Sequence, residues 1–160
     1  MNTYTVSFFG HREPDNMFEI ENQVEKIVRE MIDRKSFVEF LVGRDGEFDM
    51  FVSSIIRRVK KAKDYGNSTH ILILPYMTAE YRDNEESFRE YYDEVEICAE
   101  SDAAHFKSAF QIRNRQMVDR SDLVVFWVEH KSGGAYQTMK YAEKIGKKMI
   151  NLADEIASSR

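Results

Sequence analysis

The sequence LVVFWV at residues 123–128 is apolar at every position. A strand that protein covers on both faces has such a continuous apolar run, and strands of this kind belong to parallel sheets. The run is followed by the turn Ser132-Gly133-Gly134 and by a helical pattern over residues 135–145 that ends at Gly146. This stretch therefore predicts a strand, a glycine turn and a helix in succession, which is the repeating unit of an α/β protein.

The same unit recurs along the rest of the chain. Apolar runs predict further strands at residues 5–9, 38–42, 71–74 and 149–152. Helices are predicted over residues 20–32, 48–59 and 107–120, the first two from apolar residues at 3–4 spacing. The alternation predicts an α/β fold with a mostly parallel sheet and helices on both faces.

The chain has 160 residues, which is the length of one domain, and no Pro-, Gly- or Ser-rich linker divides it. We therefore expect a single domain over residues 1–160. Residues 76–104 break the alternation, because eight acidic and two basic residues lie between Glu80 and Glu96. We expect this acidic, aromatic segment to form a lid or excursion with a short helix and a short strand near residues 95–98. Its tyrosines either stack on a base, pack against one another or contact a second chain, and packing is the favoured interpretation.

Composition disfavours several function classes. The 23 basic and 28 acidic residues give a net charge of -5, which disfavours nucleic acid and anionic membranes as partners. The single cysteine, Cys98, excludes an internal disulfide and a cysteine zinc cage, and the histidines lack metal-ligand spacing. We expect no metal site and no cofactor. No apolar run reaches the roughly 20 residues of a membrane span, and no secretion signal opens the chain, so a cytoplasmic location is expected.

Three glycine-containing turns follow predicted strands. They are Gly10-His11-Arg12, Gly43-Arg44-Asp45-Gly46 and Ser132-Gly133-Gly134. Ligands of open parallel sheets bind beyond the carboxyl ends of the strands, and the amides that begin the next helix attract anions. We therefore expect the three turns to form one phosphate-binding crevice.

Several side chains near these turns could contact a ligand. Arg113 shares a helix face with apolar residues, so it points inward and either pairs with an internal carboxylate such as Asp49 or clamps a phosphate. Ser132 and Thr138 either bind a phosphate oxygen or cap the helix. His11 either donates to a ligand or is a surface histidine.

The assembled motifs resemble the SLOG superfamily, the Rossmann-like domains related to LOG phosphoribohydrolases and to the DNA-processing protein, and within it an uncharacterised bacterial branch. The matching stretches are FFGHR at 8–12, FLVGRDGEFD at 40–49, RNRQMV at 113–118 with SD at 121–122, and SGG at 132–134 with Thr138, Tyr141-Ala142 and Gly146-Lys147. The resemblance implies a Rossmann-like three-layer sandwich that binds a nucleotide or nucleotide derivative. The ligand-lining residues that it implies are Gly10, Arg12, Gly43, Gly46, Arg113, Gly133, Gly134 and Thr138.

The sequence departs from the phosphoribohydrolase motif Pro-Gly-Gly-x-Gly-Thr-x-x-Glu. Ser132 stands at the proline position, and Met139-Lys140-Tyr141 supplies no glutamate. We therefore expect a small phosphorylated or nucleotide-like ligand and a binding or sensing role. The alternative is an N-glycosidase acting on a nucleoside monophosphate, with Glu47 or Asp49 supplying the catalytic carboxylate. A homo-oligomer is a further expectation, by analogy with relatives that pair through helices.

Overall fold

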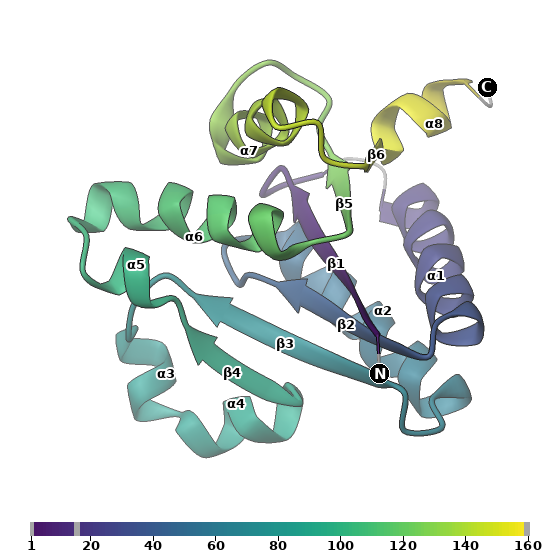
Figure 1. The fold of residues 1–160 in the computed structure, drawn as a ribbon, viewed down its shortest axis with the longest axis horizontal. Helices are drawn as coiled ribbons and strands as arrows, with labels where there is room; N and C mark the ends of the chain where they lie inside the picture. Colours follow the sequence, from purple (N-terminus) through teal and green to yellow (C-terminus); the bar gives the residue numbers. More distant parts are fainter. Residues whose placement is uncertain (1, 15–16, 159–160) are drawn as a thin grey trace.

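The computed structural model describes residues 2–14 and 17–158. It contains a six-stranded sheet in the order β4-β3-β2-β1-β5-β6 (Figure 1). Every strand pairing in it is parallel, which confirms the predicted α/β, Rossmann-like class. The strands are β1 (Thr3–Gly10), β2 (Phe37–Val42), β3 (Ser68–Leu74), β4 (Glu94–Ile97), β5 (Leu123–Trp127) and β6 (Met149–Asn151). The helices are α1 (Met17–Arg34), α2 (Glu47–Lys63), α3 (Ala79–Asp83), α4 (Glu85–Tyr91), α5 (Ala99–Asp102), α6 (Phe106–Arg120), α7 (Gly133–Lys144) and α8 (Leu152–Ser158).

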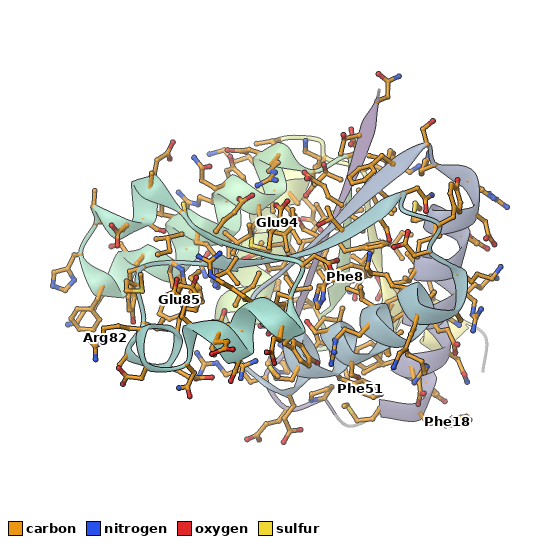
Figure 2. The ribbon with its side chains drawn as sticks, turned by 90° about the horizontal axis from the view of Figure 1, so that it is seen from below. Phe8, Phe18, Phe51, Arg82, Glu85 and Glu94 are labelled. Carbon is orange, nitrogen blue, oxygen red and sulfur yellow. The ribbon has the colours of Figure 1, made fainter. Side chains whose placement is uncertain are left out.

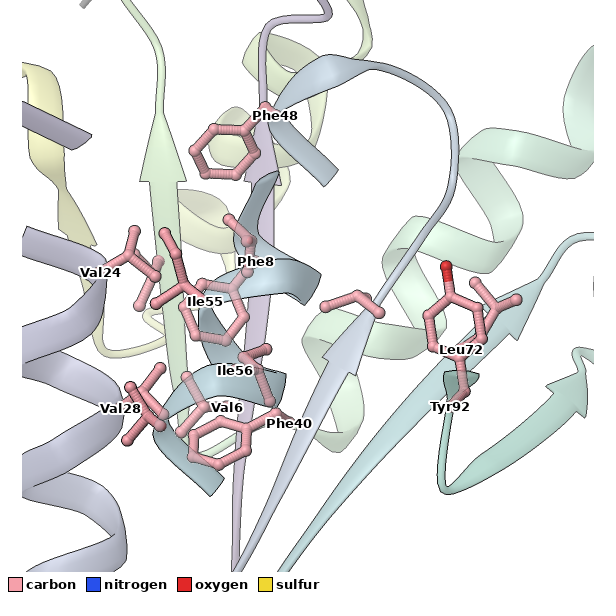
Figure 3. Packing of buried hydrophobic residues seen from close by; sticks show 14 of the residues in the cluster. Val6, Phe8, Val24, Val28, Phe40, Phe48, Ile55, Ile56, Leu72 and Tyr92 are labelled. Carbon is pink, nitrogen blue, oxygen red and sulfur yellow. The ribbon is translucent and has the colours of Figure 1, made fainter. Parts of the chain in front are cut away.

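Helices cover both faces of the sheet. Successive side chains of a strand point to opposite faces, so Phe8 and Phe9 enter two different cores. Phe8 packs on the face that α1 and α2 cover, beside Val24 and Ile55 (Figure 3). Phe9 packs in the core on the other face, which α6 and α7 cover. The two buried layers give the three-layer sandwich.

The chain reverses its direction of travel across the sheet at β1. From β1 it adds β2, β3 and β4 on one side, and it then returns to pair β5 with the other side of β1. The register places Gly10 opposite Trp127, so the carboxyl ends of β1 and β5 lie side by side. Ligands of doubly wound sheets bind at this kind of switch point.

Residues 76–104 extend the sheet. They form α3, α4, β4 and α5, and β4 pairs with the edge of β3, one residue earlier than the strand predicted near residues 95–98. Tyr81, Phe88 and Tyr92 are buried in the main core, which agrees with the packing interpretation of the aromatic cluster. Arg82 and Glu85 lie at the outer surface of this segment (Figure 2).

The end of the chain differs from the expectation. Leu152 was expected to close the last strand, whereas it begins α8 and is fully buried in the main core. The burial of this side chain explains why an apolar residue stands there. Within the described residues, no helix is both long enough and apolar enough to cross a membrane.

Candidate ligand-binding cleft

The three glycine turns meet at one edge of the sheet, because β2, β1 and β5 are neighbours. Main-chain hydrogen bonds join the first turn to the start of α2 and to the end of β5: the N–H of Glu47 donates to the Arg12 carbonyl at 2.8 Å, and that of His11 donates to the Trp127 carbonyl at 3.1 Å. Between them lies a cleft of about 480 Å³. Its lining residues are Phe9, Gly10, His11, Arg12, Glu13, Asp45, Gly46, Phe48, Asp49, Phe110, Gln111, Asn114, His130, Gly133, Gly134 and Ala135.

Close packing explains the glycines of the first two turns. A Cβ at Gly10 would lie 2.4 Å from the ring of Phe48, and one at Gly46 would lie 2.8 Å from the backbone Cα of Arg12. Contacts this short are not tolerated, so only glycine lets the turns after β1 and β2 approach one another. Both glycines line the cleft, and their first role is to let the two turns pack closely against each other.

The start of α7 has a different character. Gly133 has a φ of +89°, a conformation that favours glycine, and a Cβ there would meet nothing within 4 Å. The helix follows Ser132, whose hydroxyl makes no capping bond to α7 and instead lies 2.9 Å from Nδ1 of His130. The first amides of α7 therefore have no side-chain cap, and Gly133 and Gly134 border the cleft.

Arg113 lies beneath the cleft and does not line it. Its side chain is 1% exposed and pairs with Asp45, while Nη1 donates to the Ile73 carbonyl at 3.1 Å and Nε to Asn114 Oδ1 at 3.0 Å. Asp45 and Asn114 do line the cleft. Of the two interpretations of Arg113, the structure thus shows the internal ion pair, with Asp45 and not Asp49 as its partner.

Thr138 and Gly43 also lie behind the lining. Thr138 is fully buried one turn into α7, where its hydroxyl donates to the Gly134 carbonyl at 2.9 Å and accepts from Asn114 Nδ2 at 3.1 Å. A Cβ at Gly43 would lie 3.2 Å from Asp49 Oδ2 and 3.3 Å from Arg113 Nη1. Thr138 thus supports the wall of the cleft from behind, and Gly43 leaves room there for Asp49 and Arg113.

The two predicted catalytic carboxylates lie in different places, because residues two apart on a helix face different directions. Asp49 is buried at the cleft and accepts the N–H of Asp45 at 2.8 Å. Burial, and next the charge of Asp45, raise the pKa of Asp49 to about 7. Glu47 is exposed on the other side of α2, beside Arg44 and Met50, and does not line the cleft.

His11 faces the loop between β5 and α7. Its Nε2 accepts the N–H of Glu129 at 2.9 Å and that of His130 at 3.3 Å. Its ring stacks on the ring of His130 with centroids 3.6 Å apart and planes 3° apart. Burial, and next the neighbouring His130, lower the pKa of His11.

Sequence reasoning missed several cleft residues. Asp45, Gln111 and Asn114 were not named as ligand-binding residues, although Gln111 and Asn114 are three apart on α6 and so share a helix face. No sequence pattern marks His130, which also lines the cleft. Among residues 2–14 and 17–158, no group of three or more His, Cys, Asp or Glu side chains could hold a metal ion.

Comparison with known proteins gives structural neighbours only. No family model and no curated protein matches the chain. DNA processing protein A from Helicobacter pylori has a TM-score of 0.65 and 15% identity over 98% of this chain and 72% of its own. DNA processing protein A from Streptococcus pneumoniae has a TM-score of 0.65 and 14% identity over 91% of this chain and 49% of its own. TM1055, a structural-genomics target, has a TM-score of 0.60 and 20% identity over 97% of this chain and 81% of its own.

These neighbours and the strand order define a Rossmann-like α/β protein with its cleft at the switch point. The likeness to these structures agrees with the Rossmann-like fold that the sequence predicted. The Helicobacter pylori protein is described by its single-stranded DNA binding mode. The expectation that nucleic acid is an unlikely partner therefore has no support from the structural neighbours.

Proposed function

We propose that the cleft binds a nucleotide or nucleotide derivative and that the start of α7 receives its phosphate. The observation that carries this proposal is the absence of a side-chain cap on α7 within the described chain, at a helix end that borders the cleft. The first amides of a helix have no partner within it, and together with the helix dipole they attract an anion. A binding protein of this kind can act as a sensor of its ligand.

The charges of the cleft suit a ligand with two different ends. Arg12 is exposed and borders the cleft, so its guanidinium is available to a phosphate. Asp45 and Asp49 border the cleft on the α2 side, where their oxygens suit hydroxyl or amino donors such as those of a sugar or a base. Nucleotides combine these two chemistries.

Calorimetric titration with AMP, ADP-ribose and NAD tests the proposal. We expect one of them to bind with a dissociation constant below millimolar. The variant Arg12→Gln should weaken that binding about 10-fold, equivalent to about 1.4 kcal/mol. Lys26→Gln is the matched control, since Lys26 is exposed in the middle of α1 and does not line the cleft. Absence of binding for all three compounds, or equal effects of the two variants, would contradict the proposal.

Asp49 favours a second candidate function, N-glycosidic cleavage of a nucleoside monophosphate. A carboxyl with a pKa of about 7 still holds a proton near neutral pH and could donate it to the departing base. The assay is chromatographic detection of free base released from nucleoside monophosphates. Asp49→Asn should abolish release, while Glu47→Gln should leave it unchanged because Glu47 lies outside the cleft. Release that survives Asp49→Asn would exclude this mechanism.

Nucleic acid is a separate candidate ligand, which a gel shift at low salt tests directly. The net charge of -5 disfavours it, so we expect no shift of a single-stranded oligonucleotide. A shift that weakens as salt rises would show that the cleft or another surface contacts phosphates along a strand.

A further inference from the structure

We propose that His11 positions the anion-binding end of the cleft, because its Nε2 holds the loop between β5 and α7 in the conformation that presents the first amides of α7. The identity of the ligand rests on the proposed function above. The positioning role rests on the hydrogen bonds of the loop and can be tested without a ligand.

The hydrogen bonds of His11 require its neutral form. Nε2 accepts two main-chain N–H groups, from Glu129 at 2.9 Å and from His130 at 3.3 Å. A ring nitrogen that accepts carries no proton, so the proton of neutral His11 is on Nδ1. A second proton would place an N–H on Nε2 against the two N–H groups of the loop, and both bonds would be lost.

His130 connects this anchor to α7. Its Nδ1 lies 2.9 Å from the hydroxyl of Ser132, the residue at the N-cap position. A serine at that position commonly bonds an amide of the helix and so occupies the place of an anion. Because the hydroxyl is engaged by His130, the amides of α7 remain without a side-chain cap. The two stacked histidines therefore keep the helix start open.

Protonation of His11 would act on both contacts. It would remove the acceptor of the loop, and its charge would lie against the ring of His130 at 3.6 Å. Among the titratable and charged groups, Glu129 and His130 contact His11, and Arg12, Glu13, Asp45 and Asp49 line the same cleft. Burial and His130 lower the pKa of His11, so its positive form appears only below the ordinary value of 6.5. Anion binding at α7 should accordingly weaken in acid.

Two variants separate the acceptor from the ring. His11→Gln can place a side-chain oxygen where Nε2 accepts, and this oxygen does not titrate. His11→Phe keeps a ring against His130 and removes the acceptor. The folded state of each variant is checked from its amide spectrum, so that loss of the loop contact is distinguished from loss of the fold.

The test without ligand uses ring nitrogen shifts and amide exchange by NMR. In the wild-type protein we expect the Nδ1–H tautomer of His11 and slow exchange of the Glu129 and His130 amides at about pH 8, lost as His11 protonates. Exchange in His11→Gln should stay slow in acid apart from the intrinsic pH dependence, and exchange in His11→Phe should be fast throughout. An Nε2–H tautomer, or amides equally protected in His11→Phe, would overturn the proposal.

The test with ligand uses ADP-ribose, whose charge is constant over this range. Its dissociation constant in the wild-type protein should rise from about pH 8 to about pH 5 by up to about 30-fold, the limit for a histidine of ordinary pKa. The rise is measured relative to His11→Gln, because Asp49 also titrates in the cleft. Equal pH profiles of the two proteins would overturn the role in binding. Absence of binding for AMP, ADP-ribose and NAD alike would count against the proposed function, while the NMR result would still decide the positioning role.

Discussion

The guanidinium of Arg113 pairs with Asp45, and the carboxyl of Asp49 bonds instead to the main-chain N–H of Asp45. One cation therefore lies among two carboxyl groups, at a point where Gly43 leaves room for all three. Asp45 is the member that pairs directly with the cation and also borders the cleft. The arrangement fixes a negative charge at the ligand side and leaves Asp49 buried with a raised pKa.

Replacement of Arg113 by alanine should destabilise the protein by about 3 kcal/mol, because it leaves buried acceptors and the Asp45 charge without their partner. Urea unfolding measures the loss. Arg115→Ala is the matched control on the same helix, since Arg115 is exposed and contacts the ring of Tyr141, and it should cost less than about 1 kcal/mol. A loss for Arg113→Ala no larger than that of the control would contradict the ion-pair role.

Asp49→Asn should change how stability depends on pH. In the wild-type protein Asp49 keeps its proton up to about pH 7, whereas the unfolded chain releases it near 3.8. Between these pH values the folded state binds more protons than the unfolded state. The contribution of Asp49 to the free energy of unfolding therefore falls as pH rises, by about 1.4 kcal/mol per pH unit. Asn does not titrate, so Asp49→Asn lacks this pH dependence. The difference in the free energy of unfolding, variant minus wild type, should therefore rise with pH by about 1.4 kcal/mol per pH unit.

The stability contribution of His70 should depend on pH in the opposite direction, so His70 is a control for the same measurement. Burial lowers its pKa to about 3, while the unfolded chain takes up a proton below 6.5. The contribution of His70 to the free energy of unfolding is therefore complete above pH 6.5 and is lost as the pH falls toward 3. Relative to wild type, His70→Gln should lose stability as pH rises over this range. Unfolding curves at several pH values that show the same sign for both variants would contradict these protonation states.

The sheet was predictable because its signal is local. A run of apolar residues such as 123–128 indicates that the strand is buried on both faces. Phe8 and Phe9 agree with this rule, because they are neighbours in one strand and pack in the cores on opposite faces of the sheet. The meeting of the glycine turns follows from the strand order, since neighbouring parallel strands end at one edge. Leu152 was misplaced because a buried apolar residue is equally compatible with the end of a strand and the start of a helix.

The contacts that shape the cleft were not predictable, because they join residues far apart in the sequence. Asp45 and Arg113 are 68 positions apart, and His11 and Glu129 are 118 apart. No periodicity relates such pairs. Ser132 lies at the cap position that its residue type predicts, yet its hydroxyl is directed to His130. Glu47 could have been separated from Asp49 by helix geometry alone, since residues two apart do not share a face.

Gly46→Ala should displace the turn after β1. The new Cβ would lie 2.8 Å from the Cα of Arg12, so the two turns must separate and the bond between Glu47 N–H and the Arg12 carbonyl must lengthen. We expect a loss of about 1–3 kcal/mol and changed amide signals at Arg12 and Glu47. Gly66→Ala is the control for crowding, because a Cβ at Gly66 would meet nothing within 4 Å, so any cost there comes from its φ of +92° and not from a close contact. Its signals should change only locally, and cleft signals unaffected by Gly46→Ala would refute the close-packing explanation.

Arg44→Ala should loosen residues 76–104 selectively. Arg44 follows β2, donates to Glu80 at 2.8 Å and to the hydroxyl of Tyr92 at 3.0 Å, and lies over the ring of Phe88 at 4.6 Å. These contacts join the turn after β2 to α3 and α4, so their loss should cost about 1–2 kcal/mol. The effect should concentrate in that segment, because the strands retain their own hydrogen bonds.

Hydrogen exchange measured by mass spectrometry tests this last expectation. Amides of α3 and α4 should exchange faster in Arg44→Ala, while those of β1 and β2 keep the wild-type rate. Arg82→Ala is the matched control, since Arg82 is exposed on α3 and pairs with its neighbour Asp83. Exchange that rises equally across the sheet would mean that Arg44 supports the whole fold, because only a local contact can open one segment while the strands beside it stay closed.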